Sequence, residues 1–99
     1  MTFKIYYGIL EQKFDVTDIA YKKCMYESII YIPESEHKRC IIFDDPLHYV
    51  LKSIFVKDEN QDGLTFIFDE TKKIYIDTKE NKIYTQFNVP EHIRSVCIE

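Results

Sequence analysis

Apolar residues recur at every second position near the start of the chain, at Phe3, Ile5, Tyr7 and Ile9. This period of two predicts a strand with one buried face, because successive side chains of a strand point to opposite faces. Gly8 falls inside the pattern. A glycine within a strand indicates either a bulge or a close approach of another backbone segment.

Short runs of apolar, β-branched and aromatic residues follow along the rest of the chain, separated by polar and turn-forming residues. Such runs predict strands. We expect strands at residues 13–17, 29–32, 39–43, 50–57, 64–68, 73–77 and 82–87. Short strands at intervals of about 8–12 residues are typical of antiparallel sandwiches and barrels. The predicted fold is therefore mainly β, an antiparallel β-sandwich or open barrel.

One short helix is predicted near residues 18–26, where Thr17 or Asp18 can cap its first turn. Acidic residues at its start and lysines toward its end suit the helix dipole. A further helical turn or two is predicted at residues 90–96, because Pro90 is favourable in the first turn of a helix.

Residues 47–57 fit two patterns. The apolar residues spaced as on one helical face are Leu47, Val50, Leu51, Ile54 and Phe55. Residues 53–57 are instead rich in β-branched and aromatic side chains, as strands are. We predict a turn at 44–48 and a strand at 50–57, and a helix remains the open alternative.

Composition and charge restrict the class of protein. The 99 residues, 45% hydrophobic and 30% charged, fit one soluble globular domain spanning residues 1–99. The net charge of −4 argues against nucleic-acid and anionic-membrane partners, which need clustered cations. The apolar runs are also shorter than the roughly 18 residues of a membrane-spanning helix. We therefore expect no nucleic acid and no membrane among the partners.

The cysteines Cys24, Cys40 and Cys97 are odd in number and widely spaced. This spacing favours neither a disulfide framework nor a zinc finger. We expect a reducing, intracellular location in the cytoplasm.

Candidate metal ligands and nucleophiles cluster at His37, Cys40, Asp44, Asp45 and His48. A zinc site is not favoured, because no second ligand pair accompanies His37 and Cys40. Catalysis by Cys40 with His48 as its base is not favoured either, since the pattern offers no third orienting group. The sequence contains no glycine-rich phosphate-binding motif. We expect no cofactor, no bound metal and no enzymatic activity.

The segment 58–63, Asp-Glu-Asn-Gln-Asp-Gly, matches the first half of an EF-hand calcium loop. The second half departs from that motif, because Phe66 replaces an oxygen ligand and Asp69 stands where a bidentate Glu belongs. An ordinary turn between strands is therefore the favoured interpretation. A calcium-binding loop at 58–69 is the less favoured alternative.

Several short motifs occur in a fixed order: Tyr7-Gly8, Asp15-Val16-Thr17, Asp44-Asp45-Pro46 and Lys52. This order resembles the C-terminal domain of a DnaJ-like mitochondrial protein family, and accessory domains found beside glycosyltransferases in bacteria and large DNA viruses. The resemblance implies a mainly β, non-catalytic accessory unit that has no catalytic residues. This chain differs from the family in having Asp44 and Tyr49 where the family has Gly.

The predicted function is therefore that of a non-catalytic protein-interaction or accessory module. Self-association as a homodimer is one form of this prediction, because residues 29–32 and 66–68 are uncharged runs that can pair at a sheet edge. A carbohydrate-binding module is the alternative, since eight tyrosines offer flat apolar faces to a glycan. The many residues with AT-rich codons suit the viral members of the resemblance, and with them an association with virions.

Overall fold

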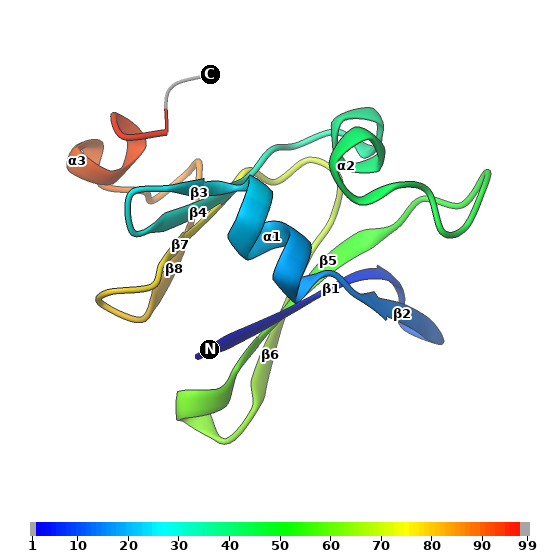
Figure 1. The fold of residues 1–99 in the computed structure, drawn as a ribbon, viewed down its shortest axis with the longest axis horizontal. Helices are drawn as coiled ribbons and strands as arrows, with labels where there is room; N and C mark the ends of the chain where they lie inside the picture. The colour runs from blue at the N-terminus through cyan, green and yellow to red at the C-terminus, as the bar shows by residue number, and fades with distance from the viewer. Residues whose placement is uncertain (1, 98–99) are drawn as a thin grey trace.

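The computed structural model describes residues 2–97 and contains two four-stranded antiparallel sheets (Figure 1). Sheet A has the order β2-β1-β5-β6, with β1 Phe3–Ile9, β2 Gln12–Asp15, β5 Ser53–Asp58 and β6 Leu64–Phe68. Sheet B has the order β3-β4-β7-β8, with β3 Met25–Tyr26, β4 Ile29–Ile32, β7 Ile74–Asp77 and β8 Lys82–Thr85. The expected fold, mainly β and sandwich-like, is confirmed.

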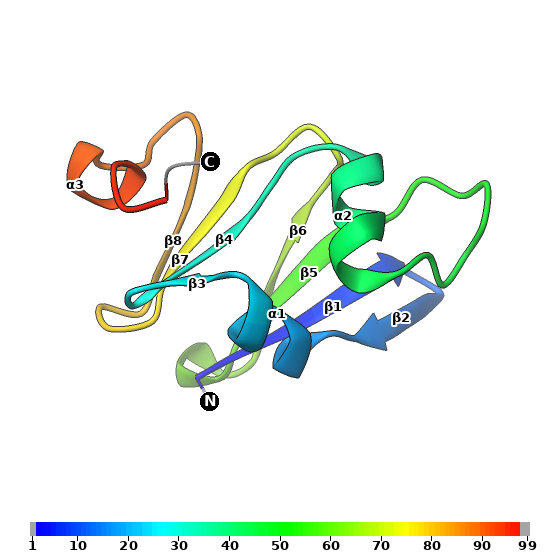
Figure 2. The ribbon, with the colours of Figure 1, turned by 45° about the horizontal axis from the view of Figure 1, so that its top comes forward.

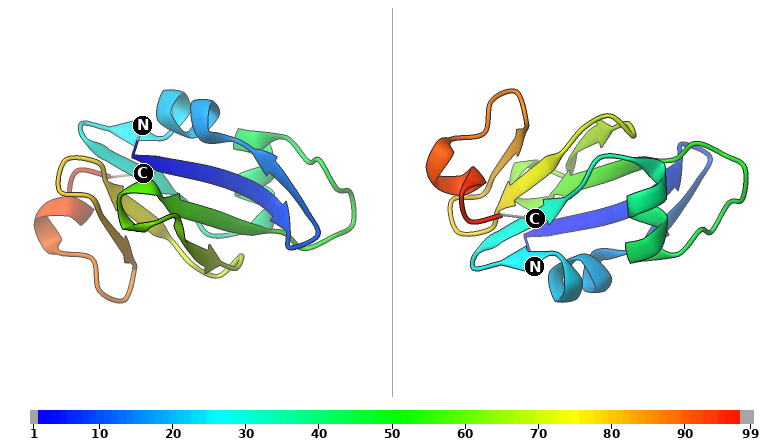
Figure 3. Two further views of the ribbon diagram at one scale, coloured as in Figure 1. Left: turned by 90° about the horizontal axis from the view of Figure 1, so that it is seen from below. Right: turned by 90° about the horizontal axis from the view of Figure 1, so that it is seen from above.

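Short helical segments connect and flank the strands. They are α1 Thr17–Lys23, α2 Glu36–Phe43, the 3-10 helix η1 Glu59–Gln61 and α3 Glu91–Arg94. Figures 1 and 2 place α3 at one end of the molecule and the loop between α2 and β5 at the other end. The helix α1 lies along one side of the sheets, next to β1 and β3 (Figure 3).

The core lies between the two sheets, on their inner faces. Its fully buried members from sheet A are Phe3, Ile5, Tyr7, Ile54 and Val56, and those from sheet B are Ile30, Ile32, Ile74 and Ile76. Within each strand these residues occupy alternate positions, so the period of two at residues 3–9 is confirmed as one buried face.

The two long sides of the sandwich differ. On one side α1 closes the core, and Val16, Ala20 and Cys24 join the buried cluster. On the other side the edge strands β6 and β8 face each other across a groove of about 370 Å³. The sandwich is thus covered by a helix on one side and open on the other.

Gly8 confirms the close backbone approach that its position in β1 predicts. Its φ of +154° lies in a region that other residues rarely adopt, and a Cβ built there would lie 2.3 Å from the backbone oxygen of Gln12. The tight connection between β1 and β2 brings these atoms together. Only glycine fits this position without a backbone shift.

The prediction of a strand at residues 39–43 is wrong, because this segment forms the second half of α2, Glu36–Phe43. The Oγ of Ser35 caps the helix by accepting a hydrogen bond from a backbone N–H three residues later (3.3 Å). Arg39 is fully buried and donates hydrogen bonds to Pro33 O (2.9 Å) and Lys72 O (2.6 Å). Because the charged Arg39 occupies the buried face of α2, the apolar spacing that would predict a helix is absent from the sequence.

The other two predicted helices are present with altered bounds. The helix expected at 18–26 is α1, which ends at Lys23 because β3 follows directly and pairs with β4. The helix expected at 90–96 is the shorter α3, and Pro90 lies at its N-cap and not in its first turn.

The sheet topology shows whether residues 47–57 form a strand or a helix, and whether the uncharged runs at 29–32 and 66–68 lie at a sheet edge. The central strand predicted at 50–57 is confirmed as β5 of sheet A, which begins only at Ser53, so the helix alternative is wrong. Residues 29–32 form β4, which lies between β3 and β7, so this uncharged run is not at a sheet edge and cannot pair there. Residues 66–68 belong to β6, which is an edge of sheet A.

Candidate functional site

Asp15 and Thr17, from the Asp-Val-Thr motif of the sequence, fix the start of α1. Asp15 Oδ1 accepts a hydrogen bond from Thr17 N (2.9 Å). The Thr17 hydroxyl in turn accepts one from Ile5 N (2.9 Å). Together with Gly8, these residues hold β1, β2 and α1 in their relative positions, so their role is structural.

The other motif residues lie close to Lys52, the residue that precedes β5. Asp45 and Pro46 lie in the loop that follows α2, and Tyr7 lies on strand β1, which neighbours β5. The side chain of Lys52 is only 1% exposed, and its ammonium lies 5.5 Å from the centroid of the Tyr7 ring. We call residues 44–52 the Lys52 loop.

Four oxygen atoms surround the ammonium of Lys52. It donates hydrogen bonds to Leu47 O (2.9 Å) and Val50 O (2.8 Å). It also pairs with the carboxylate of Glu36 on α2 and lies 2.8 Å from Asp45 Oδ1. Because an ammonium has three protons, the Asp45 oxygen is held by charge and not by a hydrogen bond of its own. One buried cation therefore joins the loop to the helix.

These contacts set the protonation states of the cluster. Burial acts to lower the pKa of Lys52, but its contacts with the carboxylates of Asp45 and Glu36 outweigh burial and raise this pKa. Contact with Lys52 lowers the pKa of Asp45. Burial acts to raise the pKa of Glu36, and the hydrogen bonds from Lys52 lower it instead. The cluster therefore holds one positive and two negative charges near neutral pH.

Tyr7 and Cys40 extend the cluster along α2. The Tyr7 hydroxyl lies 3.4 Å from Cys40 Sγ, which lies 3.5 Å from Glu36 Oε2. Burial and the hydrogen bond with Cys40 raise the pKa of Tyr7 far above its ordinary value. Burial also raises the pKa of Cys40. Both groups are protonated near neutral pH, so the thiolate that a Cys40 nucleophile requires is disfavoured.

The histidines considered as partners of Cys40 have other surroundings. His48 Nδ1 lies 3.2 Å from Asp45 Oδ2, and most of the His48 side chain is exposed. His37 is exposed on α2. Cys40 instead contacts Tyr7 and Glu36.

Glu36, Cys40 and Asp45 come close enough to hold a metal ion, with ligand atoms within 4.8 Å of one another. The ammonium of Lys52 already pairs with both carboxylates. A metal ion would have to displace this cation from them. The positive charge that the acidic residues require is therefore supplied by the protein itself.

The segment considered as a calcium loop, residues 58–69, differs in geometry from an EF-hand. Asp58 accepts hydrogen bonds from Asn60 N (3.0 Å) and Gln61 Nε2 (2.9 Å), so its carboxylate caps η1. The strand β6 follows, where an EF-hand continues into a helix. The segment has the form of a connection between two strands.

Two residues of the Lys52 loop adopt backbone conformations that favour glycine. Asp44 has φ +65° and ψ 177°, and Tyr49 has φ +64°. Such conformations cost other residues roughly 1–3 kcal/mol each. The hydrogen bonds from Lys52 to the carbonyls of Leu47 and Val50, on either side of Tyr49, hold the loop in this form.

The Lys52 loop presents apolar side chains to solvent. Tyr49 is fully exposed, Leu51 is 66% exposed, and Ile41 on α2 is exposed to a similar degree. A hollow of about 220 Å³ is lined by Glu36, Asp45, Tyr49, Val50, Leu51 and Lys52. Exposed apolar groups rimmed by polar residues are typical of interaction sites.

Four of the eight tyrosines lie in a row across sheet B: Tyr26 on β3, Tyr31 on β4, Tyr75 on β7 and Tyr84 on β8. Tyr7, Tyr31 and Tyr75 are buried, and the rings of Tyr31 and Tyr75 pack with centroids 4.9 Å apart. The exposed Tyr49 and Tyr26 lie on the Lys52 loop and on β3, on different parts of the molecule (Figure 1). The ring of Tyr26 packs against that of Tyr31 with centroids 6.4 Å apart, but the burial of Tyr31 and Tyr75 leaves little of their ring surface in this row open to a glycan.

Glu36 is the cluster residue that the sequence did not indicate. Its position becomes recognisable once Ser35 is identified as a helix cap, because an acidic residue is favoured in the first turn that follows. The mistaken strand at 39–43 concealed this signal.

Comparison of the chain with protein-family models, curated proteins and solved structures finds no match. The resemblance to the accessory-domain family therefore stays a prediction. Within residues 2–97, no helix is long and apolar enough to cross a membrane.

Replacement of Lys52 by Met should destabilise the protein strongly. Glu36 and Asp45 would lose their cation and two loop carbonyls their donor, so we expect the free energy of unfolding to fall by about 2–4 kcal/mol. The control is Lys38→Met, which breaks the exposed pair with Glu34 and should cost about 0–1 kcal/mol. Urea denaturation measures both losses. Equal losses in the two variants would contradict a central role for Lys52.

The cluster also predicts a pH dependence. Because the fold lowers the pKa of Glu36 and Asp45, their stabilisation is present above the ordinary carboxyl range near pH 4 and is lost as the pH falls through the folded values. The raised pKa of Lys52 means that its contribution is lost only as the pH rises through that value. On going from pH 7 to pH 3, Lys52→Met should therefore lose less stability than the wild type.

Denaturation of both proteins at the two pH values measures this difference. A Lys52→Met variant with the full acid sensitivity of the wild type would show that pairing with Lys52 is not its source.

Proposed function

We propose that the protein is a non-catalytic interaction module that recognises another protein through the Lys52 loop. The observation that supports this most directly is the exposure of Tyr49 and Leu51 on a loop that buried Lys52 holds in one conformation. Loops positioned by a rigid scaffold commonly carry binding residues.

The Lys52 loop is suited to binding because folding has already ordered it. Ordering a flexible segment costs roughly 1–2 kcal/mol per residue in backbone entropy. In this protein the ammonium of Lys52 fixes carbonyls on both sides of Tyr49 before any partner binds. A loop that is already ordered loses less backbone entropy on binding than a flexible loop, so more of its contact energy appears as affinity.

The exposed side chains have the chemistry of interface anchors. Tyr is enriched among the residues that dominate binding energy, and such residues act in pockets from which water is excluded. Tyr49 and Leu51 stand beside the pair of Asp45 and His48, which supplies polar groups at the edge of the apolar surface. A partner with an apolar pocket and a polar rim fits this surface.

The protonation states support a non-catalytic role for the cluster beneath the loop. The Cys40 thiol and the Tyr7 hydroxyl keep their protons, and the Lys52 amine is charged. Nucleophilic attack requires the deprotonated form of each of these groups. The cluster therefore fits a role in fixing the loop better than a role in covalent chemistry.

Affinity capture from cells of the natural host, read by quantitative mass spectrometry, tests the proposal. The double variant Tyr49→Ser/Leu51→Ser should lose at least about tenfold of a partner that the wild type captures, because loss of such an anchor costs about 2 kcal/mol or more. The matched control is Leu10→Ser, which removes a 67% exposed leucine between β1 and β2. It should retain the partner.

All three proteins should unfold at similar temperatures, since each replaced side chain is exposed. Equal recovery of every partner by the double variant and the wild type would refute recognition through the Lys52 loop.

A further inference from the structure

The four edge strands of the two sheets differ in their protection against pairing. The strand β2 carries Lys13 and Asp15, β8 carries Lys82, and β3 has only two residues. Charges and short length are the usual means of blocking edge-to-edge association. The strand β6 has five residues, Leu-Thr-Phe-Ile-Phe, and carries neither form of protection.

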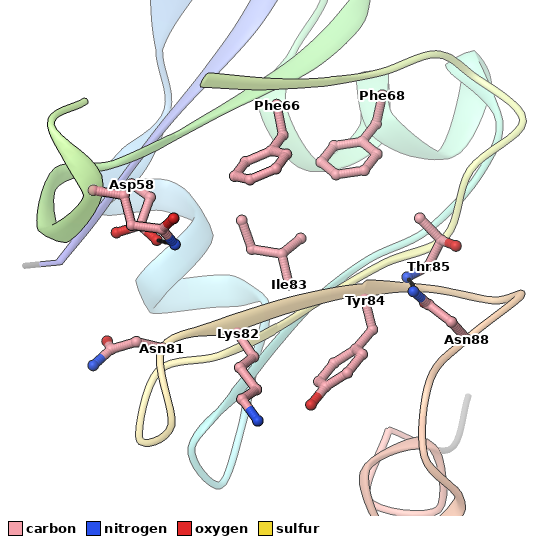
Figure 4. A pocket seen from close by; sticks show the side chains of 10 residues that line it. Asp58, Phe66, Phe68, Asn81, Lys82, Ile83, Tyr84, Thr85 and Asn88 are labelled. Atoms are coloured by element: carbon pink, nitrogen blue, oxygen red, sulfur yellow. Dashed lines mark hydrogen bonds between the residues drawn. The ribbon is translucent and has the colours of Figure 1, made fainter. Parts of the chain in front are cut away.

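The side chains of β6 alternate between two environments. Phe66 and Phe68 point toward Ile83 of β8 across the groove between the sheets (Figure 4). Thr65 and Ile67 lie on the opposite face of sheet A, paired with Lys57 and Phe55 of β5. Ile67 is 58% exposed and Leu64 is also largely exposed. The unprotected edge is thus apolar on both of its faces.

We propose that β6 pairs with β6 of a second copy of this chain, antiparallel and about a two-fold axis at Phe66. The two copies of sheet A would then form one continuous eight-stranded sheet. This use of β6 is independent of the Lys52 loop, with which it shares no residue.

The order of side chains in β6 favours its own copy as the partner. Antiparallel pairing about Phe66 places Leu64 opposite Phe68 of the second copy and Thr65 opposite Ile67. Directly opposite side chains in an antiparallel pair share a face, so apolar side chains meet and no like charges oppose each other. The phenylalanines of the second strand would extend the apolar wall at the mouth of the groove.

The net charge of −4 on each copy is a weak obstacle to this pairing. At physiological ionic strength, charges farther apart than about 8 Å are largely screened. Backbone hydrogen bonds along the two edges give affinity, and the alternating side chains set the register.

Paired charge variants of the full chain test both the pairing and its register. Thr65→Lys/Ile67→Lys places Lys opposite Lys at both positions, and Thr65→Glu/Ile67→Glu does the same with Glu. Each variant alone should be a monomer by size-exclusion chromatography with light scattering. An equimolar mixture should recover a dimer of twice the 11.9 kDa chain mass, because Lys then opposes Glu.

The wild type should be a dimer in the same experiment. Leu10→Lys/Gln12→Lys adds the same charge at the exposed connection into β2 and should leave the dimer intact. Should a β6 variant fail to fold, hydrogen exchange of the wild type provides the test. The N–H groups of alternate β6 residues that point away from β5 should then be protected at high concentration and lose this protection on dilution, while those bonded to β5 stay protected.

A wild type that stays monomeric up to about 1 mM, where a pair held by roughly 4 kcal/mol would form, overturns the proposal. So does a dimer that persists in both charged variants. A monomer that binds a foreign strand-forming peptide at β6 also overturns it, in favour of a heterologous partner.

Discussion

The buried ammonium of Lys52 is the contact on which the candidate site depends. A cation removed from water is tolerated only when charged and polar partners replace its hydration. Lys52 finds these partners in Glu36, Asp45 and two carbonyls of its own loop. A single side chain therefore fixes the approach of α2, the conformation of the loop and the entry into β5.

The two long sides of the sandwich differ in what covers the core, and this difference decides which strands are exposed. The helix α1 covers one side of the sandwich, whereas β6 and β8 leave the other side open. The Lys52 loop projects from an end of the molecule, away from α3 (Figure 2). The fold thus has two separate apolar surfaces, one on the Lys52 loop and one on the edge strand β6.

How far the sequence predicts this structure depends on which residues are buried. The strand β1 is predictable because its buried face is uniformly apolar. The helix α2 is not, because its most buried residue is Arg39, whose guanidinium donates from Nε to Pro33 O and from Nη2 to Lys72 O. The resemblance indicated Tyr7, Asp45 and Lys52, yet Glu36, the second carboxylate that pairs with Lys52, lies 16 residues before it and meets it only in the tertiary structure.

The backbone order parameters of residues 44–52, from ¹⁵N NMR relaxation, test the central claim most directly. If Lys52 fixes its loop, these amides should have values near the 0.85 that is typical of a rigid backbone, about those of β1 and β5. In Lys52→Met they should fall below about 0.6 while the strands keep theirs. Values below about 0.6 throughout the wild-type loop would contradict the claim that the buried lysine holds it.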